Sequence, residues 1–265
     1  SPQSVPGMDD ARLESLSRRY PIIAGEFEPT EGELDVLTAW YDGAIRYLDE
    51  RIGGLLEFLS RRGDLDDTYV VVTADHGELF GEHGLEKHFY SLYEPVLRVP
   101  LVIGTPDGGA FGSRTVSEPV TLADLYPTIL DLAGLTPPDR PHADSFVDPG
   151  RLPSDRYLYA EVGSKSAEPI RRHHPGFDGA ALDGPLRSVR TDEYKLIRGP
   201  GGRIELYDWR DDPAERRNLA DERPAVADQL SAVIDEELPP MSDASFREDV
   251  TDPVLQEHLE DLGYL

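Results

Sequence analysis

Residues 69–78 read Tyr69-Val70-Val71-Val72-Thr73-Ala74-Asp75-His76-Gly77-Glu78, and this stretch is the most informative in the chain. Its first four side chains favour β-structure, so they predict a short strand that is buried on both faces. Polar residues begin where this strand would end. Ligands of open parallel α/β sheets bind beyond the carboxyl ends of the strands, and Asp75 and His76 therefore lie where a site is expected.

The residues after this strand have the chemistry of a metal and ester site. Asp75 offers a carboxylate and His76 an imidazole, a mixed oxygen and nitrogen set that suits a divalent cation completed by further carboxylates. The alternative is that Asp75 caps a helix and His76 is a hydrogen-bonded loop histidine. Lys87 and His88 follow, and either can bind an anionic ester oxygen or protonate a leaving alcohol. Their alternative is a solvated surface pair.

The composition of the 265-residue chain excludes several classes of partner. The formal net charge is -26, with 52 acidic and 26 basic residues, and like charge repels nucleic acid and anionic membranes. Lysine occurs only at positions 87, 165 and 195. This acidic, Arg-rich composition indicates a halophilic source, with an acidic protein of a GC-rich mesophile as the alternative. Without cysteine there is no disulfide, thiolate zinc site or cysteine nucleophile.

No apolar stretch is long enough to span a membrane, and no secretory leader opens the chain. A soluble protein is therefore expected, and a cytoplasmic location is favoured. Thr30 and Glu33 have the spacing of a capping box, and the apolar residues after them predict a long helix that ends before Gly63.

Three regions are expected along the chain. Residues 1–29 are rich in proline and glycine and predict a connecting segment. Residues 30–150 carry the α/β pattern of a core. Residues 151–265 contain short strand candidates at 156–162, 186–190, 194–198 and 204–207, followed by a helix at 225–238. Strands so closely spaced on tight turns predict an antiparallel sheet with a helix packed on it.

Five motifs follow one another along the chain: Thr73-Ala74-Asp75-His76-Gly77-Glu78, Gly81-Glu82-His83-Gly84, Lys87-His88, Leu92-Tyr93-Glu94 and Arg98-Val99-Pro100-Leu101-Val102-Ile103. Together they resemble the second signature region of the sulfatase family, in the alkaline phosphatase superfamily. The likeness covers residues 33–220. It implies an α/β fold: part of an alkaline-phosphatase-like sandwich, with a mostly parallel sheet flanked by helices and a small antiparallel carboxy-terminal subdomain.

The resemblance also implies roles for individual residues. In the family, the residues that match Asp75 and His76 bind a divalent metal, which is usually Ca²⁺, with Mg²⁺ or Mn²⁺ as alternatives. The family's sulfate-contacting lysine lies four residues before the tyrosine that matches Tyr93. Here Lys87 lies six residues and His88 five residues before it, so both are candidates. The implied substrate is a sulfate-ester small molecule or glycan.

One family motif does not occur in this sequence. Sulfatases use a formylglycine made in a Cys/Ser-x-Pro-x-Arg motif, and the chain has none. We therefore expect the carboxy-terminal part of a metal-dependent sulfuric ester hydrolase, truncated, inactive alone and partnered by a missing amino-terminal half. One alternative is a phosphoesterase or phosphonate monoesterase of the same superfamily. The other is a non-catalytic remnant or binding module.

Overall fold

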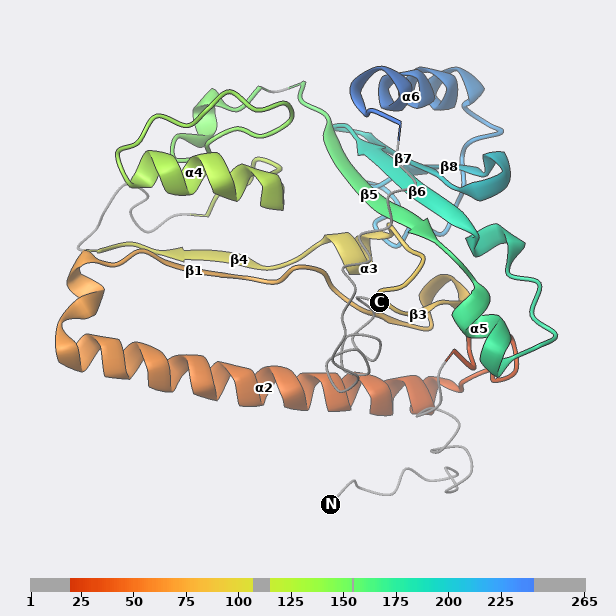
Figure 1. The fold of residues 1–265 in the computed structure, drawn as a ribbon, viewed down its shortest axis with the longest axis horizontal. Helices are drawn as coiled ribbons and strands as arrows, with labels where there is room; N and C mark the ends of the chain where they lie inside the picture. The colour runs from red at the N-terminus through yellow and green to blue at the C-terminus, as the bar shows by residue number, and fades with distance from the viewer. Residues whose placement is uncertain (1–19, 107–114, 154, 241–265) are drawn as a thin grey trace, which may run out of the picture.

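The computed structural model describes residues 20–106, 115–153 and 155–240, which form two groups of elements (Figure 1). The longer elements are α2 (Glu31–Arg62), β1 (Val70–Thr73), β4 (Leu101–Gly104), α4 (Leu125–Leu132), β5 (Leu158–Lys165), α5 (Glu168–His173), β6 (Gly184–Arg190), β7 (Tyr194–Arg198), β8 (Ile204–Asp208) and α6 (Pro224–Glu237). Between β1 and β4 lie three short elements, β2 (Leu79–Phe80), β3 (Glu86–Lys87) and α3 (Glu94–Leu97).

The helix α2 begins and ends where the sequence predicts. Thr30 N donates to Glu33 Oε2 at 2.8 Å, which closes the capping box, and Gly63 adopts the left-handed conformation with φ 78°. Most of its large apolar side chains remain exposed: Trp40, Tyr41, Ile45, Tyr47, Leu48, Leu55 and Phe58. Among the described residues, no helix combines the length and the apolar character that crossing a membrane requires.

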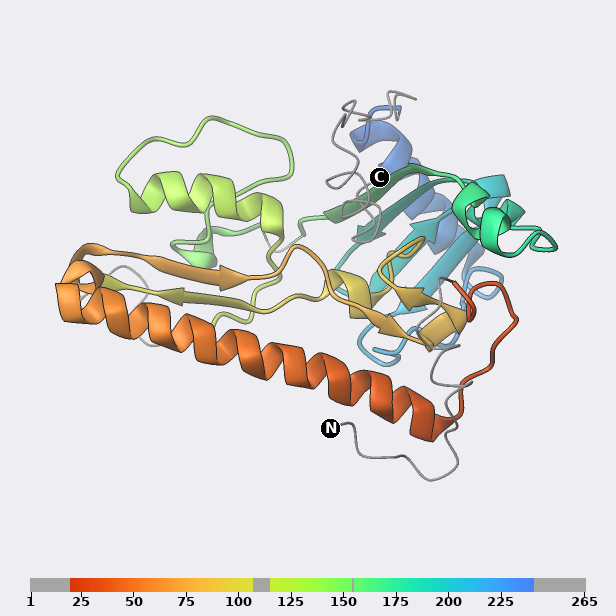
Figure 2. The ribbon, with the colours of Figure 1, turned by 60° about the horizontal axis from the view of Figure 1, so that its bottom comes forward.

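The strands β1 and β4 form a two-stranded ribbon that lies between α2 and α4 (Figures 1 and 2). They pair antiparallel, with Val70 opposite Gly104 and Thr73 opposite Leu101. β1 is only half-buried and Val102 of β4 is 63% exposed. The expectation that β1 is buried on both faces is therefore not met. Its neighbour β4 returns along it, and every strand pair within the described residues is antiparallel, so the mostly parallel sheet that the resemblance implied is not found among them.

The carboxy-terminal group of elements, β5 to β8 with α6, contains the antiparallel sheet that the sequence predicts. Its strands lie in the order β5-β6-β7-β8, and α6 packs on one face of the sheet. Val189, Leu196 and Leu206 are fully buried under this helix, together with Ile234 of α6. Burial of apolar side chains stabilises a sheet and helix pair by about 25 cal/mol for each Å² removed from water. This layer therefore forms the main hydrophobic core of the group.

A buried ion cluster fastens α3 to this sheet. Lys195 of β7 is fully buried, and its Nζ lies 2.9 Å from Glu94 Oε1 and 2.7 Å from Glu215 Oε1. The backbone N of Glu94 also donates to Glu215 Oε2 at 2.7 Å. Arg190 adds a further contact to Glu94 Oε2 at 3.2 Å. Two carboxylates and two cations therefore balance one another at the start of α3.

We expect the substitution Lys195→Met to destabilise the chain by about 3–5 kcal/mol, because it leaves Glu94 and Glu215 buried without their shared cation. Urea unfolding measures this change. Arg46→Met is the control, because the pair of Arg46 with Glu50 is largely exposed and its loss should leave the midpoint unchanged. An equal, small effect of both substitutions would contradict the assigned role of Lys195.

Candidate functional site

The loop that follows β1 places Asp75 and His76 next to each other. Asp75 Oδ1 accepts the backbone N–H of His76 at 3.0 Å, and Asp75 Oδ2 lies 3.7 Å from His76 Nε2. The side chain of Asp75 is 67% exposed, whereas that of His76 is 29% exposed. A carboxylate oxygen and an imidazole nitrogen at this separation can ligate one cation, because ligand bonds to divalent ions are about 2.0–2.6 Å long.

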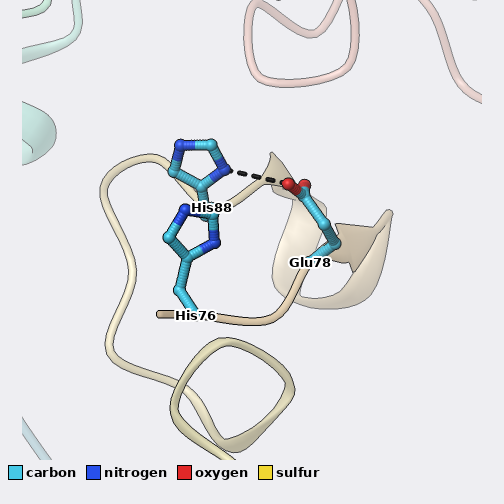
Figure 3. A group of neighbouring side chains, drawn as sticks. All are labelled: His76, Glu78 and His88. Atoms are coloured by element: carbon cyan, nitrogen blue, oxygen red, sulfur yellow. Dashed lines mark hydrogen bonds and ion pairs between the residues drawn. The ribbon is translucent and has the colours of Figure 1, made fainter. Parts of the chain in front are cut away.

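The hairpin formed by β2 and β3 carries His88 back over His76 (Figure 3). The centroids of the two imidazole rings lie 3.9 Å apart, with 32° between the ring planes. His88 Nδ1 lies 2.9 Å from Glu78 Oε1. One ligand atom from each of His76, Glu78 and His88 lies within 4.8 Å of the other two. The described residues therefore bring a carboxylate and two imidazoles together at the end of β1.

Lys87 is separated from this group although it is adjacent to His88 in sequence. Its Nζ lies 5.9 Å from the ring centroid of Phe89, over the face of the ring. Lys87 has φ 60° at the end of β3, and the described contacts join His88, but not Lys87, to His76 and Glu78. Of the four residues singled out from the sequence, the structure thus places His76 beside both Asp75 and His88. Glu78 is the member that sequence reasoning missed, although it stands two residues after His76.

The backbone of the loop is held close to α3. Gly77 N donates to Val96 O at 2.8 Å, and a Cβ atom at Gly77 would lie 2.1 Å from the backbone oxygen of Pro95. Only glycine permits this approach. Further along, His83, Lys87 and Tyr90 all have φ near +60°. Strained backbone of this kind is found at functional sites when the surrounding contacts enforce it.

Aromatic and acidic side chains lie between the loop and the carboxy-terminal sheet. The ring of His83 stacks on Tyr93 with 3.6 Å between centroids, and Tyr93 OH donates to Glu205 Oε2 at 2.8 Å. His83 is exposed on one side, but burial of its ring against Tyr93 lowers its pKa. Burial also raises the pKa of Tyr93, and the neighbouring Glu205 adds to this effect. Tyr93 therefore stays protonated at neutral pH.

Glu86 of β3 carries a buried carboxyl group, on the same hairpin that positions His88. Burial raises its pKa to about 7, against the opposing effects of Lys87 and of backbone hydrogen bonds from Ile22 and Ile23. These hydrogen bonds tie the segment that precedes α2 to β3. The protonation state of Glu86 is therefore coupled to the packing of the hairpin that carries His88.

Two family profiles and several curated proteins match this chain. The profile described as Sulfatase matches residues 14–135, and the profile described as N-sulphoglucosamine sulphohydrolase, C-terminal, matches residues 81–242. Arylsulfatase K of Bos taurus is 32% identical over 234 residues, which are 81% of this chain and 40% of that protein.

Two solved structures are similar to this chain. A 2-O GAG sulfatase has a TM-score of 0.66 and 25% identity, with 78% of this chain and 44% of that chain covered. The phosphonate monoester hydrolase of Agrobacterium radiobacter has a TM-score of 0.63 and 26% identity, with 80% of this chain and 44% of that chain covered.

The chain belongs to the sulfatase family of the alkaline phosphatase superfamily. The expected α/β fold class with a small antiparallel carboxy-terminal sheet is confirmed. The chain spans 40% of the length of bovine arylsulfatase K and 44% of each of the two structures. Members of this family generally use a divalent metal, and the ligand atoms of His76, Glu78 and His88 form a possible site for such an ion.

We expect Gly77→Ala to destabilise the chain by about 1–3 kcal/mol, because the added Cβ collides with the backbone oxygen of Pro95. Thermal or urea unfolding measures the change. Gly53→Ala in α2 is the matched control: a Cβ there meets nothing within 4 Å, and alanine in a helix should stabilise by about 0.5–1 kcal/mol. Changes of the same sign at both positions would contradict the close approach at Gly77.

The raised pKa of Glu86 predicts a pH-dependent stability. Between the unfolded pKa of 4.5 and the folded pKa of about 7, the folded state holds a proton that the unfolded state releases. The contribution of Glu86 to the free energy of unfolding therefore decreases as pH rises through this window, by at most about 3 kcal/mol. Glu86→Gln should be more stable than the wild type at about pH 8 and similar to it at about pH 5.

Urea unfolding at both pH values measures the difference between Glu86→Gln and the wild type. Glu50→Gln, at an exposed position of α2, controls for the change in net charge. If Glu86→Gln and Glu50→Gln show the same pH dependence, Glu86 is not the group responsible.

Proposed function

We propose that this chain is the carboxy-terminal part of a metal-dependent sulfuric ester hydrolase. The observation that carries the proposal is the position of His76 beside both Asp75 and His88 after β1, in a chain of the sulfatase family. Its substrate is a sulfate-ester small molecule or glycan. The 2-O GAG sulfatase among the similar structures supports a sulfated glycan.

In this proposal Asp75 and His76 hold the divalent metal, with Ca²⁺ as the first candidate and Mg²⁺ or Mn²⁺ as alternatives. A hard carboxylate oxygen beside an imidazole nitrogen supports this assignment. The bound metal supplies charge stabilisation to the ester oxygens. His76 Nδ1 donates to Gly77 O at 2.9 Å, and a carbonyl oxygen only accepts, so Nε2 is the atom left with a lone pair.

His88 contacts the ester and donates a proton to the leaving oxygen. Its ring lies beside that of His76, whereas Lys87 turns toward Phe89. An imidazole carries and releases protons near neutral pH, which suits this role. Lys87 is the second candidate for the ester contact. Its flexible side chain can leave the ring of Phe89 at modest cost.

The nucleophile comes from other polypeptide, equivalent to the amino-terminal half of a sulfatase. The sequence contains no cysteine and no Cys/Ser-x-Pro-x-Arg motif. The exposed apolar side chains of α2 and β4, such as Trp40, Leu55 and Val102, support a further layer that covers them. We propose the same division as the sequence suggested: a connection at 1–29, half of a core at 30–150 and a subdomain at 151–265.

Two other functions remain as candidates. The similarity to a phosphonate monoester hydrolase supports phosphorus in place of sulfur. A non-catalytic module that keeps the fold is the second candidate. We also propose that the net charge of -26 adapts the chain to concentrated salt, in which screening weakens the self-repulsion.

Calorimetric titration with Ca²⁺ tests the metal assignment. We expect weak binding, with a dissociation constant of about 10⁻⁴–10⁻³ M, because only Asp75 and His76 contribute. Asp75→Ala should abolish this binding, whereas His83→Ala, in the same loop, should leave it unchanged. Binding that survives Asp75→Ala but disappears in Glu78→Ala would instead assign the ion to the group of His76, Glu78 and His88.

A turnover assay tests the need for a separate nucleophile. The pure chain should release no 4-nitrophenol from 4-nitrophenyl sulfate or from a 4-nitrophenyl phosphonate ester, even with Ca²⁺ present. Absorbance of the phenolate measures the release. Turnover of either substrate by the pure chain, lost in His88→Ala, would show that the described residues are sufficient and would overturn this part of the proposal.

A further inference from the structure

We propose that Glu78 is a positioning residue that fixes the ring of His88 so that Nε2 is the atom presented to the ester. This inference rests on the role proposed above for His88. Neither the metal pair nor the ester contact uses Glu78, yet it is one of the three side chains gathered at the end of β1 (Figure 3).

The register of the hairpin places Glu78 opposite His88. In the pairing of β2 with β3, Leu79 is opposite Lys87 and Phe80 is opposite Glu86. One step outward in the same register, Glu78 faces His88. Gly81 N donates to Leu85 O at 2.9 Å at the tip, which sets the length of the turn. Cross-strand neighbours in antiparallel pairs have side chains within reach of each other.

The hydrogen bond between the two side chains selects one tautomer of His88. Glu78 Oε1 lies 2.9 Å from His88 Nδ1, and an ionised carboxylate only accepts. Nδ1 therefore keeps its proton in both charge states of the ring, and Nε2 is the atom that gains or releases the proton passed to the leaving oxygen. In Figure 3 the second ring nitrogen of His88 lies on the side away from Glu78. Carboxylates hold catalytic and metal-binding histidines in this way in many proteins.

Burial strengthens this contact. The side chains of Glu78 and His88 are 24% and 19% exposed, so water competes weakly for the hydrogen bond. The ring of His76 lies against one face of the His88 ring, and Phe89 lies 4.4 Å from it between centroids. These neighbours restrict how far the ring can tilt, while the carboxylate decides which nitrogen faces it. Packing and hydrogen bonding together leave one orientation for Nε2.

NMR of the chain labelled with ¹⁵N at histidine measures the tautomer directly. At a pH at which the spectra show the ring to be neutral, the wild type should carry the His88 proton on Nδ1. Glu78→Ala should shift the tautomer equilibrium toward Nε2–H by about tenfold, the effect of losing one charge-assisted hydrogen bond. Glu78→Gln should retain the Nδ1–H form, because the amide oxygen still accepts. His88→Ala identifies the signals.

The variant Glu82→Ala tests whether a tautomer shift of His88 comes from loss of the Glu78 carboxylate or from a loosened hairpin. Glu82 Oε2 accepts the backbone N–H of Phe80, so this variant loosens β2 without touching His88. It should leave the tautomer of His88 unchanged. The proposal is overturned if the wild type carries the proton on Nε2, if Glu78→Ala leaves the tautomer unchanged, or if Glu82→Ala gives the same shift.

The same spectra keep this inference distinct from the proposed metal site. Added Ca²⁺ should move the signals of His76 in the wild type and leave them in place in Asp75→Ala. If Ca²⁺ does not move the signals of His76 but His88 shows the expected tautomer, the metal assignment is refuted and the role of Glu78 is supported. The opposite pair of results would retain the metal assignment and refute the role of Glu78.

Discussion

The ammonium of Lys195 is the constraint on which the placement of the site depends. It is buried on β7 and needs two carboxylates, one from Glu94 at the start of α3 and one from Glu215 after β8. The position of α3 sets the loop in turn, because Gly77 N donates to Val96 O. One buried charge thus connects the carboxy-terminal sheet to the candidate metal-site side chains at the end of β1.

Elements whose signals are local could be predicted from the sequence. The helix α2 begins after the capping box of Thr30 and Glu33 and ends before Gly63, and each signal acts within one helical turn. The burial of β1 could not be predicted in this way. A run of valines shows that a strand is apolar, but its burial depends on which elements cover the ribbon. Here β4 pairs with it on one edge and the valines remain half-buried.

The candidate site could also be predicted only in part, because contacts between residues far apart in the chain have no local signal. Asp75, His76 and His88 could be named as candidates from their residue types and their motif, whereas Glu78 could not, because its partner lies ten positions away across a hairpin. Spacing to Tyr93 left Lys87 and His88 as equal candidates. In the structure the ring of His88 lies against that of His76, whereas Lys87 Nζ lies over the ring of Phe89, and spacing along the sequence does not distinguish these two positions.

The two-residue strands of the hairpin make its tip a place for grafting. Glu82, His83 and Gly84 are exposed, and the pairing of Leu79 with Lys87 does not involve them. A reporter peptide inserted between Glu82 and His83 would lengthen the tip without changing the register of the strands, at the cost of the hydrogen bond from Leu85 N to Glu82 O. Loss of a single residue from β2 or β3 would instead shift the register, which moves the side chains of that strand to the opposite face. The hairpin therefore tolerates added length at its tip and none within its strands.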